Sequence, residues 1–139
     1  MKNGKNGSNG KDQKFAYING VAHEIKYNHT SVLKFVREHI SEKEVPSLCD
    51  DPNLVPYGAC RVCSVDVALK KDGPTRTVAS CHTPVTEGSY IITQNEDLTK
   101  LRKNIVELVL TDHPMTCSTC EVNNNCELHI QPPIFMTPW

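Results

Sequence analysis

Hydrophobic and polar residues alternate with a period of two over the first patterned stretch of the chain. Residues 15–18 (FAYI) are followed by Asn19-Gly20 and then by a second alternating stretch over 21–27. Asn-Gly is strongly favoured in two-residue hairpin turns, because both central positions of such a turn need positive φ. The pattern therefore predicts a β-hairpin over 15–27.

The period then changes to that of a helix. Apolar residues recur on one helix face at positions 32, 33, 36 and 40, and Thr30 or Ser31 stands before them as an N-cap. A hairpin followed by a helix is how a β-grasp domain begins. The Pro- and Cys-rich stretch 46–63 is expected to form an irregular loop.

Further strands and a second helix are predicted beyond this loop. Alternating residues at 65–69 and 75–79 flank a turn at 71–74, and a short strand at 90–93 completes the sheet. Asn95 or Asp97 then caps a helix whose apolar face is formed by positions 98, 101, 105, 108 and 109. Pro114 cannot continue that helix, so we expect it to end near Asp112.

Length and charge exclude several classes of protein. The 139 residues suffice for one domain with an appendage, and 15 Lys and Arg against 16 Asp and Glu provide no field for nucleic acid. No apolar run approaches the roughly 18 residues of a membrane span. The start MKNGKNGSNGK has no apolar stretch behind it, which argues against a secretory signal and favours a cytoplasmic, reducing location.

The most informative residues are the 7 cysteines, an odd number that cannot pair completely. Four have the spacing C-x10-C-x2-C-x17-C within the expected β-grasp unit, and four thiolates complete a 2Fe–2S site. Three follow the second helix as C-x2-C-x5-C, one short of a four-ligand site. His113 is the obvious fourth ligand, and His129 is its rival. The first group is Cys49, Cys60, Cys63 and Cys81, and the second is Cys117, Cys120 and Cys126.

Spacing alone leaves zinc open as an alternative metal. Three cysteines and one histidine with a C-x2-C pair also form a zinc-site pattern, and two such pairs can build a two-knuckle site. The β-grasp pattern around the first group, however, differs from zinc knuckles. Arg61, between two of the cysteines, is a candidate to offset cluster charge or a plain surface residue.

Two longer motifs carry a resemblance to a known family. PSLCDDPNLVPYGACRVCSVDV with ASCHTPVTEGSYIIT, and later HPMTCSTCEVNNNCEL, resemble the amino-terminal region of the large iron–sulfur subunit of complex I. They are similar also to diaphorase subunits of NAD-reducing hydrogenases, to FeFe hydrogenases and to some formate dehydrogenases. The resemblance covers roughly residues 14–128. Where relatives usually carry glycine, this chain has Asn123-Asn124-Asn125, and asparagine is the next best residue for a left-handed conformation.

The resemblance implies an α+β fold with a β-grasp 2Fe–2S ferredoxin-like domain, a helix and a small 4Fe–4S loop. By motif match, Cys49, Cys60, Cys63 and Cys81 hold the 2Fe–2S cluster, and His113, Cys117, Cys120 and Cys126 hold the 4Fe–4S cluster. The expected division is a disordered tail over 1–13, the 2Fe–2S domain over 14–94, the helix and 4Fe–4S segment over 95–128, and an extended docking tail over 129–139.

Both sites are filled by protein ligands, so the chain is expected to transfer electrons without catalysing bond chemistry itself. No nicotinamide or flavin fingerprint is present, so those cofactors belong to other subunits of an oxidoreductase complex, with a catalytic or ferredoxin-type partner. No nucleic acid and no membrane insertion are expected. Two alternatives remain: the truncated amino-terminal region of a hydrogenase or formate dehydrogenase, and a zinc-stabilised interaction module.

Overall fold

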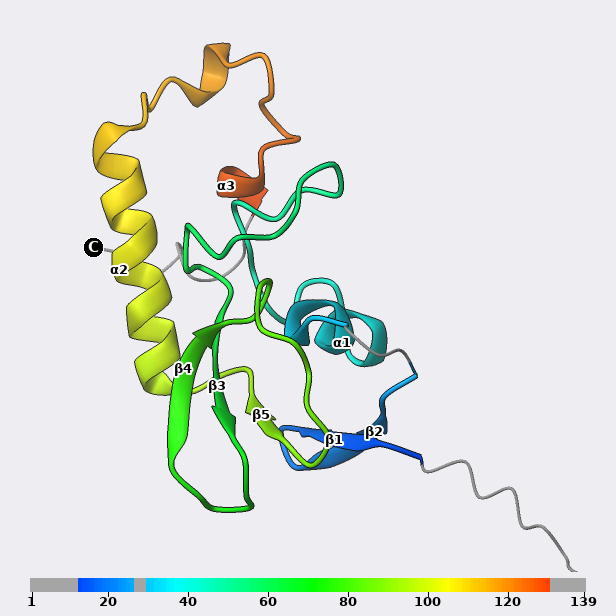
Figure 1. Ribbon diagram of the computed structural model, residues 1–139. Helices are drawn as coiled ribbons and strands as arrows, with labels where there is room; N and C mark the ends of the chain where they lie inside the picture. The colour runs from blue at the N-terminus through cyan, green and yellow to red at the C-terminus, as the bar shows by residue number, and fades with distance from the viewer. Residues whose placement is uncertain (1–12, 27–29, 131–139) are drawn as a thin grey trace, which may run out of the picture.

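A computed structural model describes residues 13–26 and 30–130 and contains one five-stranded mixed sheet, whose strands run in the order β2-β1-β5-β3-β4 (Figure 1). The pairs β1–β2, β3–β4 and β3–β5 are antiparallel, whereas β1 and β5 are parallel. The strands are β1 (Phe15–Ile18), β2 (Val21–Glu24), β3 (Ser64–Ala68), β4 (Thr75–Ala79) and β5 (Tyr90–Ile92).

The first hairpin forms as predicted. Asn19 and Gly20 have φ of 49° and 88°, the left-handed values that a tight hairpin turn between right-twisted strands requires. The Asn19 side chain also donates a hydrogen bond to the Thr93 hydroxyl (2.8 Å) and accepts one from the Thr93 N–H (3.0 Å). These two bonds tie the hairpin turn to the end of β5.

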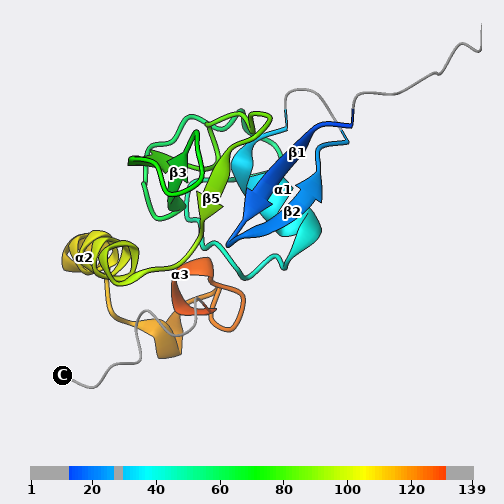
Figure 2. The same ribbon diagram turned by 90° about the horizontal axis from the view of Figure 1, so that it is seen from below.

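The core lies between the sheet and α1 (Val32–His39), which crosses one face of the sheet (Figures 1 and 2). Ser31 caps the helix, as predicted, by accepting a hydrogen bond from the Lys34 N–H (3.3 Å). The buried apolar cluster combines residues from the helix, the strands and the cysteine-bearing segments: Ala16, Ile18, Val32, Leu33, Phe35, Val36, Val45, Cys63, Val65, Ala79, Cys81 and Ile91. Two of the candidate ligand cysteines are therefore part of the core.

The long helix α2 (Glu96–Asp112) lies beside the β3–β4 end of the sheet. The predicted cap and end are confirmed, since Asn95 accepts a hydrogen bond from the Leu98 N–H (2.7 Å) and the helix ends before His113. Asn95 also donates to Asp66 on β3 (2.8 Å). These contacts fix where the helix begins relative to the sheet.

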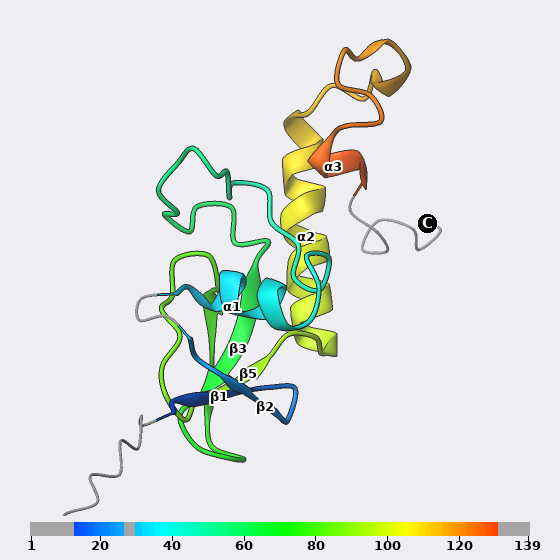
Figure 3. The same ribbon diagram turned by 90° about the vertical axis from the view of Figure 1, so that its right-hand side faces the viewer.

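The buried face of α2 differs from the predicted one. Its buried residues are Leu98, Arg102 and Val106, whereas Leu108, expected on the buried face, is 72% exposed. The carboxyl half of the helix extends beyond the sheet in Figures 1 and 3, so its apolar side chains have no strand to pack against. A narrow stripe at four-residue spacing is all that contacts the sheet.

Beyond α2 the chain forms two short helical turns, η1 (Cys117–Thr119) and α3 (Glu127–Ile130). Figure 3 places η1 past the far end of α2, from where the chain turns back to α3. Residues 1–12 of the expected amino-terminal tail and 131–139 of the expected docking tail lie outside the described residues. Among the helices described here, none has the length and apolar character needed to cross a membrane.

Replacing Asn95 with alanine is expected to lower the free energy of unfolding of the metal-free protein by about 1–3 kcal/mol. The change removes both the helix cap and the hydrogen bond to the buried Asp66 carboxylate. Urea denaturation followed by circular dichroism measures the effect. Asn104→Ala, on an exposed position of the same helix, is the matched control and should change stability by less than about 0.5 kcal/mol; equal effects of the two changes would contradict the assigned cap.

Candidate metal centres

The β3–β4 ladder positions two of the first four cysteines. Cys63 immediately precedes β3 and Cys81 follows β4, and the antiparallel register pairs Ser64 with Ala79. The two cysteines therefore emerge at the same end of the ladder, opposite the turn at 71–74. They are only 1% and 2% exposed.

The serine beside Cys81 fixes the backbone of Cys63. Ser80 is fully buried, and both its N–H (3.3 Å) and its hydroxyl (2.6 Å) donate to the Cys63 carbonyl oxygen. This double hydrogen bond extends the ladder by one step beyond the strands. It holds the two buried thiols beside each other.

The loop between α1 and β3 brings the other two cysteines to the same place. The Cys60 N–H donates to the Cys49 Sγ atom at 3.5 Å. Burial, together with the adjacent thiols of Cys63 and then Cys49, raises the pKa of Cys81 to about 12. The four thiols thus form one cluster, in which Cys49 adjoins Cys60 and Cys63 adjoins Cys81.

Backbone amides of the loop face these sulfur atoms. Burial opposes ionisation of Cys60, but the N–H groups of Val62, Leu48 and Cys49, aided by the Cys49 thiol, outweigh it and lower the pKa of Cys60. The Gly58 backbone likewise faces Cys81 and favours its thiolate. Convergent N–H groups are what stabilises negative charge on a thiolate or on a bound anionic group.

Two left-handed residues shape this loop. Gly58 has φ +70°, and a Cβ placed there would lie 3.2 Å from the Ala79 Cβ atom, so glycine is required for both its φ and its lack of a side chain. Arg61 also has positive φ (64°), and its carbonyl accepts hydrogen bonds from the Ser64 N–H (3.1 Å) and hydroxyl (2.6 Å). The Arg61 side chain is exposed, so its described role is in the turn.

Side chains from outside the loop brace it. Arg37 on α1 forms an ion pair with Asp50 (3.1 Å), next to Cys49, and donates to the Ser47 hydroxyl (2.7 Å). On the other side, the His82 ring nitrogen Nδ1 lies 3.1 Å from the Pro56 carbonyl oxygen. The loop that carries Cys49 and Cys60 is therefore tied both to the helix and to the segment after β4.

The second group of candidate ligands lies at the far end of α2. His113 is the C-cap residue of that helix, Cys117 opens η1, Cys120 follows η1, and Cys126 precedes α3. Their side chains are exposed or half-buried. Among the described residues, no three His, Cys, Asp or Glu side chains converge closely enough to hold a single metal ion.

The backbone of this second segment has the turn that the asparagine run predicts. Asn124 has φ +68°, the left-handed conformation for which asparagine replaces glycine at small cost. The Asn123 N–H donates to the Cys120 carbonyl (3.1 Å), and the Asn125 N–H donates to the Val122 carbonyl (3.0 Å). Both cysteine-bearing segments, 46–63 and 113–126, rise from the same end of the sheet in Figures 1 and 3.

The sequence pattern missed a charged residue next to the first group. Arg102 on α2 is 4% exposed and lies close enough to Cys63 for their charges to interact. It interrupts an apolar stripe, since it stands four residues from both Leu98 and Val106. That spacing is the signal that could have found it.

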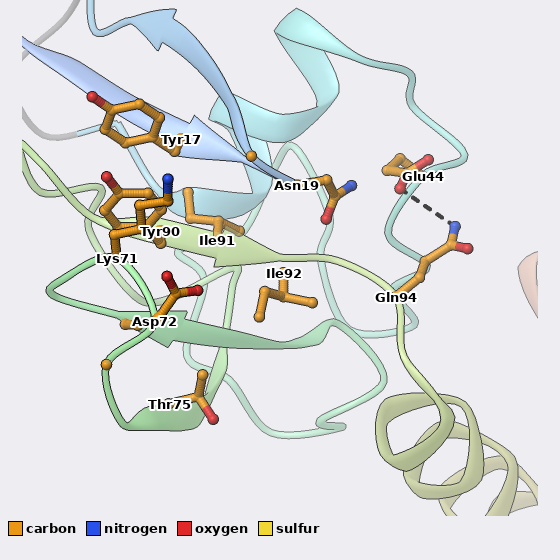
Figure 4. Close-up of a pocket in the computed structure, with 13 residues that line it drawn as sticks. Tyr17, Asn19, Glu44, Lys71, Asp72, Thr75, Tyr90, Ile91, Ile92 and Gln94 are labelled. Atoms are coloured by element: carbon orange, nitrogen blue, oxygen red, sulfur yellow. Dashed lines mark hydrogen bonds between the residues drawn. The ribbon is translucent and has the colours of Figure 1, made fainter.

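A separate hollow of about 720 Å³ lies at the opposite end of the β3–β4 hairpin (Figure 4). The rings of Tyr17 and Tyr90 stack over it with centroids 4.4 Å apart. Its rim includes Lys71 and Asp72 from the turn. No cysteine is among its lining residues in the described part of the chain, so the hollow is distinct from the thiol cluster.

Comparison with protein families decides what these cysteines belong to. Residues 17–96, more than half of the chain, match the family described as the 2Fe-2S iron-sulfur cluster binding domain. The chain belongs to this family. Residues 102–131 match the NADH-ubiquinone oxidoreductase-G iron-sulfur binding region, which is of the 4Fe–4S type. The resemblance and the α+β fold expected from the sequence are thereby confirmed, as are the two expected cluster types.

Curated relatives are much longer than this chain. The alpha subunit of the NADPH-Fe(3+) oxidoreductase of Geobacter sulfurreducens is 39% identical over 84 residues, which are 60% of this chain and 10% of that protein. The G-type polypeptide of the NADH-quinone oxidoreductase of Escherichia coli is 37% identical over 95 residues, 68% of this chain and again 10% of the relative. The chain thus spans about a tenth of the length of the curated relatives it matches.

A solved structure has the same fold. An NAD+-reducing [NiFe]-hydrogenase in its H2-reduced state superposes with a TM-score of 0.66 at 24% identity, covering 84% of this chain and 46% of that one. The likeness extends beyond the 2Fe–2S domain, since residues 17–96 alone are a smaller share of the chain than the superposition covers. The arrangement of sheet and helices therefore recurs in that protein.

Replacing Gly58 with alanine is expected to cost about 1–3 kcal/mol and to reduce iron incorporation at the first cysteine group. The added Cβ meets Ala79, and φ at this position is left-handed. Gly88→Ala is the matched control, because its φ of +75° is similar but no atom lies within 4 Å of its added Cβ. Visible absorbance and iron analysis after anaerobic reconstitution would show equal iron loss in both variants if close packing at Gly58 were unimportant.

Proposed function

We propose that Cys49, Cys60, Cys63 and Cys81 hold the 2Fe–2S cluster. The observation that carries the proposal is the meeting of four thiols, one pair from the loop and one pair from the two ends of the β3–β4 ladder. A 2Fe–2S cluster takes four thiolates, two on each iron, which suits thiols arranged in two adjoining pairs. The amides that face Cys60 and Cys81 suit the negative charge of such a group.

We infer that the 4Fe–4S cluster is held by His113, Cys117, Cys120 and Cys126. The support is the donor set within the matched 4Fe–4S region and the left-handed turn at Asn124, which reverses the chain between the last two cysteines. An imidazole in place of one thiolate removes a negative charge from the site. We therefore expect a higher reduction potential for it than for an all-cysteine site in the same surroundings.

The function that fits these sites is electron relay within a larger oxidoreductase complex. Iron–sulfur clusters exchange single electrons, and ligand sets completed by the protein leave no position for a substrate. We propose that electrons pass between a flavin- and NAD(P)-linked subunit and a catalytic or ferredoxin-type partner, with no catalysis by this chain. Relatives named for NADH, for NADPH and for an NAD+-reducing hydrogenase support a nicotinamide-linked complex.

We further propose that the chain divides functionally into residues 14–94, which carry the first site, and 95–128, which carry the second. The helix α2 joins the two parts and begins with the contacts of Asn95 to the sheet. It ends at the histidine of the second site. A relay needs its two sites at a fixed separation, which a continuous helix supplies.

The chain reconstituted without oxygen is expected to contain about six iron atoms, the sum of the two cluster types. Cys63→Ala should reduce the content to about four and His113→Ala to about two, because each change removes a ligand from one cluster. Inductively coupled plasma mass spectrometry measures iron and zinc together. Stoichiometric zinc and little iron in the unmodified chain would contradict the proposed function.

His129→Ala is the matched control for the second site. The His129 side chain lies outside the described residues, and its place three residues after Cys126 makes it the alternative imidazole ligand. We expect this variant to retain about six iron atoms. Retention of the second cluster in His113→Ala, with its loss in His129→Ala, would transfer the ligand assignment to His129.

A further inference from the structure

The guanidinium of Arg102 is buried between α2 and the sheet without an ion-pair partner among the described residues. Its Nη2 atom donates to the Ser64 carbonyl oxygen (2.6 Å) and to the Thr93 carbonyl oxygen (2.8 Å). Its Nε atom is buried and has no hydrogen-bond partner in the described structure. A buried cation in this state is costly unless negative charge lies close by.

Three groups supply negative charge near Arg102: Cys63, Glu44 and Asp66. Both carboxylates are engaged elsewhere. Glu44 accepts from the Thr93 hydroxyl (2.6 Å), and Asp66 accepts from Asn95 (2.8 Å) and Thr77 (2.6 Å). Burial lowers the pKa of Arg102, but a guanidinium stays charged at any physiological pH, so its positive charge is permanent.

Of the three, Cys63 connects Arg102 to the first site. The Ser64 carbonyl that Arg102 binds belongs to the residue next to Cys63, so the guanidinium is held on the core side of that thiol. The other arginines near the site differ: Arg61 is exposed, and Arg37 is paired with Asp50. Charges in water are screened, whereas a charge in the interior acts at full strength over several ångströms.

We propose that Arg102 is a positioning residue that raises the reduction potential of the 2Fe–2S cluster through Cys63. The inference rests on the proposed function, since it needs the cluster at Cys63. Reduction brings one electron, and hence one further negative charge, to the site without breaking or forming a covalent bond. A permanent cation beside the ligand stabilises the reduced form more than the oxidised form.

The test compares Arg102→Gln, which removes the charge, with Arg102→Lys, which keeps it but cannot reproduce the geometry of the guanidinium. Lys100→Gln is the matched control, because it removes a charge from an exposed position of the same helix. The full chain carrying both clusters is titrated with dithionite and redox mediators. Electron paramagnetic resonance follows the reduced 2Fe–2S cluster.

At the midpoint potential of the unmodified chain, we expect Arg102→Gln to shift the ratio of oxidised to reduced cluster at least about tenfold toward the oxidised form. For a one-electron couple that corresponds to a potential about 59 mV more negative. Arg102→Lys and Lys100→Gln should each change the ratio less than about threefold, which is roughly half that shift on the same scale.

An unchanged ratio in Arg102→Gln, or equal shifts in Arg102→Gln and Arg102→Lys, would overturn the inference, because charge would then not be the cause. Should Arg102→Gln fail to incorporate the cluster, iron content decides: incorporation by Arg102→Lys alone supports the need for a cation, and failure of both overturns it. Absence of iron from the unmodified chain would instead refute the proposed function itself.

Discussion

The antiparallel pairing of β3 with β4 is the constraint on which the first site depends. Its register places Cys63 and Cys81 at one end of the ladder, and Ser80 extends the pairing by donating two hydrogen bonds to the Cys63 carbonyl. The two thiols are thereby fixed by the most regular part of the fold. The loop that carries Cys49 and Cys60 then folds against a frame that is already in place.

That frame also explains why a small domain can keep buried sulfur reactive toward metal. The thiols of Cys63 and Cys81 lie in the apolar core, where burial opposes their ionisation. Loop amides and the buried Arg102 act in the opposite direction, by favouring negative charge. The site is thus balanced between a core that excludes water and polar groups that accept an anionic cluster, which is the environment in which electrons move with little rearrangement of solvent.

Local sequence rules predict much of this arrangement, and contacts between distant segments account for the rest. The Asn19-Gly20 turn and the caps at Ser31 and Asn95 depend on neighbouring residues, so they could be predicted. The grouping of cysteines likewise followed from spacing, because the β-grasp pattern already implied which strands would meet. An apolar pattern, however, assigns arginine to the surface. Only the packed structure places Arg102 inside, where the carbonyl groups that it binds belong to other segments of the chain.

Low-temperature electron paramagnetic resonance of the dithionite-reduced chain tests most directly whether it carries two different iron–sulfur clusters. Two separable signals are expected, one persisting to higher temperature as 2Fe–2S clusters do and one broadening early as 4Fe–4S clusters do. The first should vanish in a variant lacking Cys81 and the second in one lacking Cys120. A silent spectrum from fully reconstituted, reduced protein would contradict the assignment of both clusters.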